Sequence, residues 1–184
     1  MEKETLEELV NKKLTGKKSL YSAIREVYKD ESAGKIKLID PSPPTSFAEY
    51  MRRLDYSLWF WSALTLIVLA PASITLSNIA PSTLPLRYVF GSIYILFIPG
   101  YVLVEALYPE EKSLTPLERL ALSIGLSLAI IPLIGLLLNY TPWGIRLEPI
   151  VTSTIIYAVA MLFIAAYRKY TIVKMVAETI KSTK

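Results

Sequence analysis

The chain beyond residue 57 contains four long apolar stretches. They cover residues 58–76, 84–107, 116–138 and 149–167, and crossing a bilayer core of roughly 30 Å takes about 20 helical residues. Short polar or proline-containing segments separate them, so neighbouring stretches are expected to pack as antiparallel helical pairs. The pattern predicts an all-α membrane protein with four transmembrane helices over residues 58–167.

Residues 1–44 have the pattern of a small helical unit on the cytoplasmic side. Apolar residues recur at helical spacing over residues 6–14 and 20–28, and Thr5 with Glu8 forms a capping box before the first run. Residues 35–38, Lys-Ile-Lys-Leu, alternate as a short strand does. Two helices followed by a strand resemble the second half of a winged helix, so we predict a partial winged-helix-like unit.

Two amphipathic segments flank the apolar region. Ser46 and Glu49 form another capping box, which opens a predicted interfacial helix over residues 45–57. Residues 168–184 carry five basic side chains and one acidic side chain, a net charge of +4, together with an apolar face. Both segments are expected to contact anionic membrane lipids.

The distribution of basic residues predicts the orientation. Eleven of the 20 Lys and Arg residues precede residue 58 and five follow residue 167, which leaves Arg87, Lys112, Arg119 and Arg146 between them. With both termini in the cytoplasm, eighteen basic residues lie inside and only Arg87 and Arg146 lie outside, as the positive-inside rule requires. We therefore predict a multi-pass protein of the cell membrane. Asn139 stands in a glycosylation sequon on the outer side.

The composition removes several kinds of chemistry. The chain has no Cys and no His, and its three Asp residues all precede residue 58. Thiolate nucleophiles, disulfides, imidazole bases and zinc–thiolate sites are therefore excluded. No catalytic, cofactor-binding or metal-ligating residue is predicted, and no cofactor is expected.

Prolines occur inside the second and third apolar stretches. Pro99, followed by Gly100, and Pro132 each remove a backbone donor and favour a kink. Paired broken helices mark the substrate site of some transporters. Pro99 lies nearer the cytoplasmic end and Pro132 nearer the outer end, so we interpret both as kinks that shape the bundle.

Two carboxylates lie within the apolar stretches. Glu118 forms a capping box with Thr115 at the start of the third stretch. Glu105 lies about one helical turn from the end of the second. Ionisable groups inside a span are candidate functional groups, so Glu105 either forms an ion pair at the membrane rim, with Arg119 or Lys112, or takes part in transport.

Three short motifs carry a family resemblance: Pro99-Gly100-Tyr101, Leu117-Glu118-Arg119 and the segment TPWGI at residues 141–145. With these motifs, residues 86–150 resemble an archaeal family of uncharacterised integral membrane proteins, the domain of unknown function 1616 (DUF1616). The resemblance implies a membrane location and an archaeal source. It implies no activity.

We expect a non-enzymatic integral membrane protein, a scaffold or subunit that docks a partner through residues 1–44. The alternative is a small transporter or channel subunit that uses the kinked second and third helices. A lipid-modifying enzyme would need Ser123 or Ser127, and no base lies at a suitable spacing. The expected partners are membrane lipids and either a second copy or another protein. Residues 1–57 hold eleven basic and ten acidic side chains, and this balance argues against nucleic acid.

Overall fold

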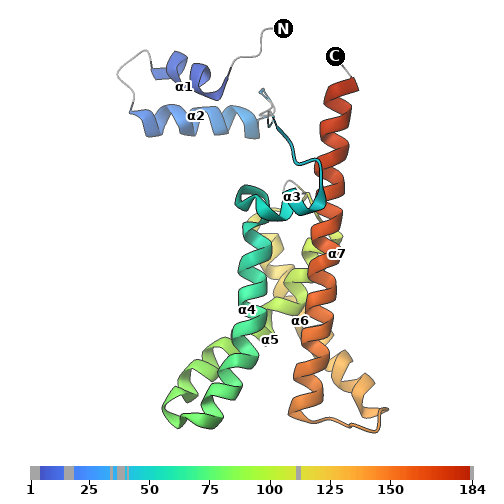
Figure 1. Cartoon of the computed structure of the whole chain (residues 1–184). Coiled ribbons are helices and arrows are strands. Elements are labelled where there is room, and N and C mark those ends of the chain that lie inside the picture. The colour runs from blue at the N-terminus through green and yellow to red at the C-terminus, as the bar shows by residue number, and fades with distance from the viewer. Residues whose placement is uncertain are drawn as a thin grey trace. The chain divides into compact units, whose positions relative to one another are not determined.

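The computed structural model of the chain describes residues 5–14, 19–33, 35, 36, 40, 42–110 and 113–182. Within these ranges it has seven α-helices, one short 3-10 helix and no strand (Figure 1). The chain divides into two compact units, Met1–Pro43 and Pro44–Lys184. The prediction of an all-helical protein with four long apolar helices is confirmed.

The first unit consists of α1 (Leu6–Leu14) and α2 (Leu20–Ser32). The predicted capping box at α1 is present: the Thr5 N–H donates to Glu8 at 2.8 Å, and the Glu8 N–H donates to the Thr5 hydroxyl at 3.3 Å. The core of the unit is small: of its described residues, Val10, Ala23 and Val27 are buried in it.

The winged-helix prediction finds no support in the described part of the first unit. Lys35 and Ile36 adopt bends instead of a strand, and Ile36 packs against the small core between α1 and α2. Residues 37 and 38, the rest of the predicted strand, lie outside the described ranges. Ile36, one of the two apolar residues behind the strand prediction, therefore covers a helical core.

An ion pair of the first unit predicts a pH-dependent stability. Asp30 bonds Lys13 and lies 3.7 Å from Lys35, and the hydrogen bond from Lys13 lowers the pKa of Asp30 below its ordinary value of 3.8. Because the folded-state pKa is lowered, the stabilisation is complete above pH 3.8 and is lost as the pH falls through the lowered pKa. We expect the methyl NMR signals of Val27 to shift towards their unfolded positions in that pH range. In the Asp30→Asn variant this pH-dependent shift should be absent.

The second unit contains the remaining elements: α3 (Phe47–Arg52), α4 (Leu54–Ile79), η1 (Pro81–Thr83), α5 (Leu84–Leu107), α6 (Pro116–Asn139) and α7 (Leu147–Ser182). The helices α4, α6 and α7, and η1 together with α5, are each long and apolar enough to cross a membrane. Helix α4 begins four residues before the predicted start at 58 and ends three residues after 76. Asn139 is the last residue of α6.

The predicted single helix over residues 45–57 is wrong in one respect, because the chain breaks at Arg53. Arg53 has an extended backbone (φ −80°, ψ 108°) that separates α3 from α4. The Ser57 hydroxyl donates to the Arg53 carbonyl at 2.9 Å and the Met51 carbonyl at 3.0 Å, and Trp61 Nε1 donates to Met51 at 3.2 Å. The Arg53 carbonyl also accepts the Ser57 N–H at 3.0 Å as the first bond of α4, so the bonds to Met51 are the ones that satisfy a carbonyl at the break.

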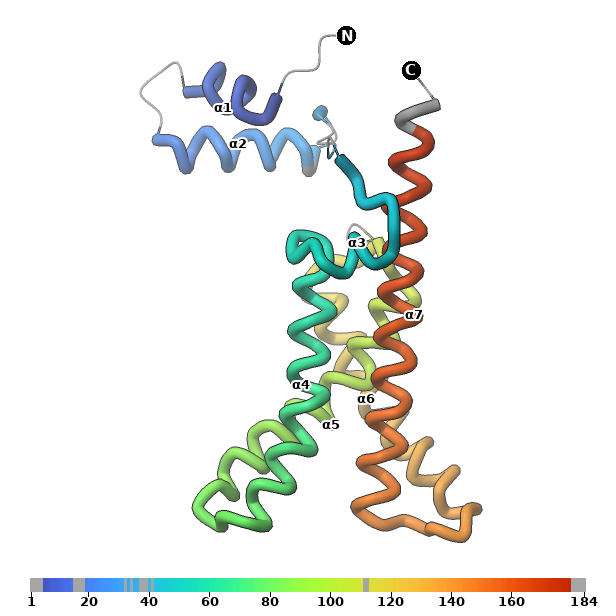
Figure 2. Tube along the Cα trace, viewed as in Figure 1, coloured from blue at the N-terminus to red at the C-terminus, as the bar shows by residue number. Residues whose placement is uncertain are grey.

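The predicted boundary between the fourth span and the basic tail, at residue 168, does not coincide with a helix end. Helix α7 runs without interruption for 36 residues, about 54 Å at 1.5 Å per residue. Figure 2 shows this single helix continuing past the level of α3. Because Pro149 lies in the first turn and no Gly or Pro follows it in the helix, nothing in the sequence ends the helix at the fall in hydropathy.

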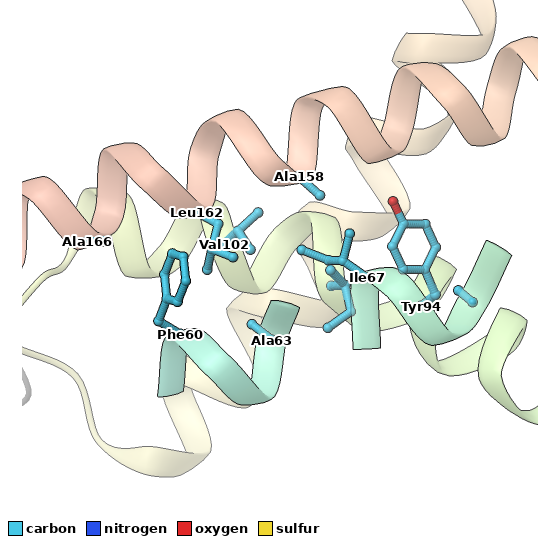
Figure 3. Close-up of a cluster of buried hydrophobic side chains, with 10 residues drawn as sticks. Phe60, Ala63, Ile67, Tyr94, Val102, Ala158, Leu162 and Ala166 are labelled. Carbon is cyan, nitrogen blue, oxygen red and sulfur yellow. The ribbon is translucent and has the colours of Figure 1, made fainter. Parts of the chain in front are cut away.

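Helix α5 is the centre of the second unit. It contacts α4, α6 and α7, whereas α4 and α6 make no contact with each other in the described part of the chain. The apolar core joins α4, α5 and α7 (Figure 3). Its buried members are Phe60, Ala63, Ile67, Ala70, Tyr94, Ile98, Val102, Ala158, Leu162 and Ala166. Helix α6 packs on α5 outside this core, and only Ser123, Ser127 and Leu138 of it are buried.

Candidate functional site

Glu105 binds two cations from two other helices. It lies in the last turn of α5, and its side chain is 3% exposed. Its Oε1 accepts a hydrogen bond from Nη1 of Arg119 in α6 at 2.6 Å. Its Oε2 makes no aligned hydrogen bond, but Nζ of Lys169 in α7 lies 2.5 Å away, and at that distance Coulomb attraction dominates.

Arg119 reaches Glu105 because the start of α6 is fixed. Both bonds of the predicted capping box are present, from the Glu118 N–H to the Thr115 hydroxyl at 3.3 Å and from the Thr115 N–H to the Glu118 carboxylate at 2.8 Å. Pro116 occupies the first helical position, where its missing N–H costs nothing. Glu118 therefore positions the helix that carries Arg119, and the Arg119 guanidinium pairs with the Glu105 carboxylate.

The end of α5 attracts further cationic groups. Arg168 of α7 donates to the Ala106 carbonyl, and Arg119 Nη2 donates to the carbonyls of Tyr108 at 3.3 Å and Glu110 at 3.2 Å. The last carbonyls of a helix lack intrahelical donors and carry partial negative charge. The three cations thus neutralise both the Glu105 carboxylate and the C-terminal end of α5.

Lys169 also connects this cluster to α4. Its Nζ lies 4.0 Å from the centre of the Trp59 ring, a cation–π distance. Four helices therefore each contribute one side chain: Trp59 from α4, Glu105 from α5, Arg119 from α6 and Lys169 from α7. We call these four residues the Glu105 clamp.

Helices α5 and α6 cross closely beside the clamp. The Gly100 N–H donates to the Ser127 hydroxyl at 2.7 Å. A Cβ atom at Gly100 would lie 1.9 Å from the Ser123 carbonyl oxygen and 2.6 Å from the Ser127 nitrogen. Small residues at such a crossing let two backbones approach. The close contact therefore requires Gly100 of α5. By contrast, a Cβ atom added at Gly125 of α6 would have nothing within 4 Å.

Aromatic side chains fasten α3 to α7 next to the clamp. The Tyr170 hydroxyl donates to the Thr45 carbonyl at 2.9 Å. The Phe47 ring lies 5.8 Å from that of Tyr170 and 6.2 Å from that of Tyr167, and the Tyr50 ring lies 6.1 Å from Tyr170. Residues 167–170 of α7 therefore hold α3, α4 and α5 within about one helical turn.

The predicted site residues take three different positions. Glu105 and Arg119 form the ion pair that was one of the two alternatives; Lys112, the other predicted partner of Glu105, lies outside the described residues. Pro99 and Gly100 lie at the α5–α6 crossing. Pro132 lies inside α6, which continues through it, and it joins neither the clamp nor the crossing.

Sequence reasoning missed Lys169 and Trp59. Lys169 was assigned to a separate basic tail, although it follows the buried Leu162 and Ala166 at helical spacing. That spacing, together with the absence of a helix-breaking residue, was the signal for a side chain facing the bundle. Trp59 stands at the start of the first apolar stretch, and nothing in its position there marks it as a partner of Lys169.

The described residues contain no group of three or more acidic side chains that could hold a metal ion. Each oxygen of Glu105 is occupied by a cation of the chain. A clamp of this kind neutralises a buried charge and joins helices.

Comparison with protein families identifies the chain. Residues 66–181 match a family described as "Domain of unknown function (DUF8471)". The chain belongs to this family. The DUF8471 region begins inside α4 and ends inside α7, so it includes Glu105, Arg119 and Lys169 and leaves out α1, α2 and α3. No curated protein and no solved structure matches the chain.

The DUF8471 match overturns the resemblance to DUF1616, and no finding supports an archaeal source. The three motifs behind that resemblance have general physical roles. Pro99-Gly100 lies at a close helix crossing, Glu118 completes a capping box, and residues 141–145 connect two helices. Membrane-type helical bundles of different families need these devices, so the motifs do not distinguish among them.

Proposed function

We propose that this DUF8471 protein is a non-enzymatic, multi-pass protein of the cell membrane with both termini in the cytoplasm. It acts as a scaffold or subunit that docks a protein through its first unit. Lipids surround the four apolar helices. The Glu105 clamp holds the ends of these helices together so that the docking unit has a stable anchor.

The uncovered apolar face of α2 carries this proposal. Leu20, Tyr21 and Tyr28 are 58%, 75% and 56% exposed, and Ile24 is also exposed. A helix whose apolar surface extends this far beyond its own core supports a protein-binding face, and tyrosine is enriched at such interfaces. These side chains belong to the first unit, whose charges are nearly balanced. Burial of apolar surface therefore drives the binding of a partner to this face.

The arrangement of Glu105 favours a structural role over transport. A carboxylate that binds a transported ion or proton needs an accessible oxygen and a route to it. Arg119 and Lys169 occupy the two oxygens of Glu105. The Ser123 hydroxyl donates to the Arg119 carbonyl at 2.7 Å, and Ser127 accepts the Gly100 N–H, so neither serine is poised for attack on a lipid.

Docking is tested by the size of the complex after gentle extraction from membranes. We expect the variant with Tyr21→Ser, Ile24→Ser and Tyr28→Ser to migrate as a smaller species than the unaltered chain, because it loses the apolar face. Ser22→Ala on the same helix is the matched control and should leave the size unchanged. Equal sizes for all three proteins would refute docking through α2.

The proposed topology is tested with single cysteines, which the cysteine-free chain makes unambiguous. We expect a membrane-impermeant maleimide to label Ser82→Cys and Arg146→Cys on intact cells, since these residues belong to the two predicted outer connections. Ser113→Cys, between α5 and α6, should react only after the cells are permeabilised. Labelling of Ser113→Cys on intact cells would show that the orientation is the opposite of the one proposed.

A further inference from the structure

Helix α2 has a wider apolar surface than α1 covers. At 100° per residue, Leu20, Ile24, Tyr28 and Tyr21 span an arc of about 100° next to Ala23 and Val27. Ala23 and Val27 are buried against α1, whereas the other four are exposed. The whole apolar arc of α2, from Ala23 to Tyr21, is about 160° wide, and α1 covers only the part around Ala23 and Val27.

The described residues of the first unit do not show the other devices that stabilise very small domains. Folded units of about 40 residues usually require disulfides, metal ions or oligomerisation. The chain has no cysteine, and the described residues hold no acidic cluster suited to a metal ion. Association with another helix is the remaining device.

The size of the uncovered face fits a symmetric pair. Four large side chains of α2 and the 48% exposed Leu6 of α1 expose roughly 500 Å² per copy, since a fully exposed aromatic side chain has about 150–250 Å² to bury. Two copies would bury about 1,000 Å², the size from which a specific interface is expected. An open groove of about 480 Å³ between α1 and α2, lined in part by Leu6, Ile24 and Tyr28, adjoins the face.

We propose that the occupant of this face is a second copy of the same chain, with two α2 helices packed antiparallel about Ile24. This inference rests on the proposed docking function and names its partner. A twofold axis at Ile24 brings the two Ile24 side chains together and sets Leu20 against Tyr28 of the partner subunit. Membrane anchoring holds both first units on one side of the bilayer, which raises their effective concentration.

Disulfide crosslinking of the full-length chain in membranes tests the pairing. Ile24→Cys places the thiols at the twofold axis, whereas Ser22→Cys points away from the proposed interface. Because a disulfide requires Cβ atoms about 3.5–4.5 Å apart, we expect mild oxidation to crosslink Ile24→Cys about tenfold more than Ser22→Cys. The product should have twice the mass of the chain.

A charge exchange tests the antiparallel arrangement. In the Ile24→Cys background, Leu20→Glu or Tyr28→Lys alone should abolish crosslinking, because each buries a charge without a partner. The two together should restore it, since each Glu then faces a Lys of the other copy. Circular dichroism of each variant confirms that its helices are intact.

Each outcome decides between the two proposals. Equal crosslinking at Ile24→Cys and Ser22→Cys, or no restoration in the charge exchange, overturns the pairing of two α2 helices. Crosslinking of Ile24→Cys to a protein of different mass also overturns it, yet leaves the docking function intact. An unchanged complex size after loss of the apolar face refutes the docking function itself.

Discussion

Glu105→Gln is expected to lower the free energy of unfolding by about 3–5 kcal/mol, the usual cost of removing one partner of a buried ion pair. The amide cannot neutralise Arg119 and Lys169, whose side chains are also largely buried. Helices α6 and α7 both lose the carboxylate that pairs their cations with α5. The measurement is reversible unfolding in mixed micelles with increasing mole fraction of a denaturing detergent.

Glu110→Gln is the matched control for this variant. It removes the same charge five residues further on, from an exposed side chain, so its effect should stay within about 0.5 kcal/mol. Lys169→Met should cost less than Glu105→Gln, because Arg119 still neutralises the carboxylate. A result in which Glu105→Gln matches Glu110→Gln would show that the clamp adds nothing to stability.

The helices and their starts were predictable because they depend on local sequence. Apolar runs of about 20 residues identify α4 to α7, and Thr115 with Glu118 marks the start of α6 through neighbours three residues apart. Charge density misled the prediction at Lys169, since the fall in hydropathy placed this residue in a basic tail instead of in the helical bundle. A helix ends where its hydrogen bonding is broken, and no residue after Pro149 breaks it.

The contacts between helices could not be predicted in the same way. Glu105 had two candidate partners near it in sequence, yet its second cation comes from Lys169, 64 residues away on a helix whose rotation depends on the apolar core. Trp59 joins the clamp for the same reason. For Ser123 and Ser127, the sequence does not show which residue of α5 meets them.

Gly100 and Ser127 separate steric fit from hydrogen bonding at the α5–α6 crossing. Ser127→Ala removes the acceptor of the Gly100 N–H and keeps the close approach, so we expect a loss of about 1 kcal/mol. Gly100→Ala keeps the Ser127 hydroxyl and removes the space.

We expect Gly100→Ala to destabilise the bundle by about 3 kcal/mol or more, at the upper end of overpacking effects. The added methyl would lie 1.9 Å and 2.6 Å from backbone atoms of Ser123 and Ser127, which no side-chain rotation can move, so α5 and α6 must separate. Gly91→Ala, in the same helix with nothing within 4 Å of its Cβ position, should be neutral or slightly stabilising. The same unfolding measurement compares the two variants, and equal stabilities would contradict a close crossing at Gly100.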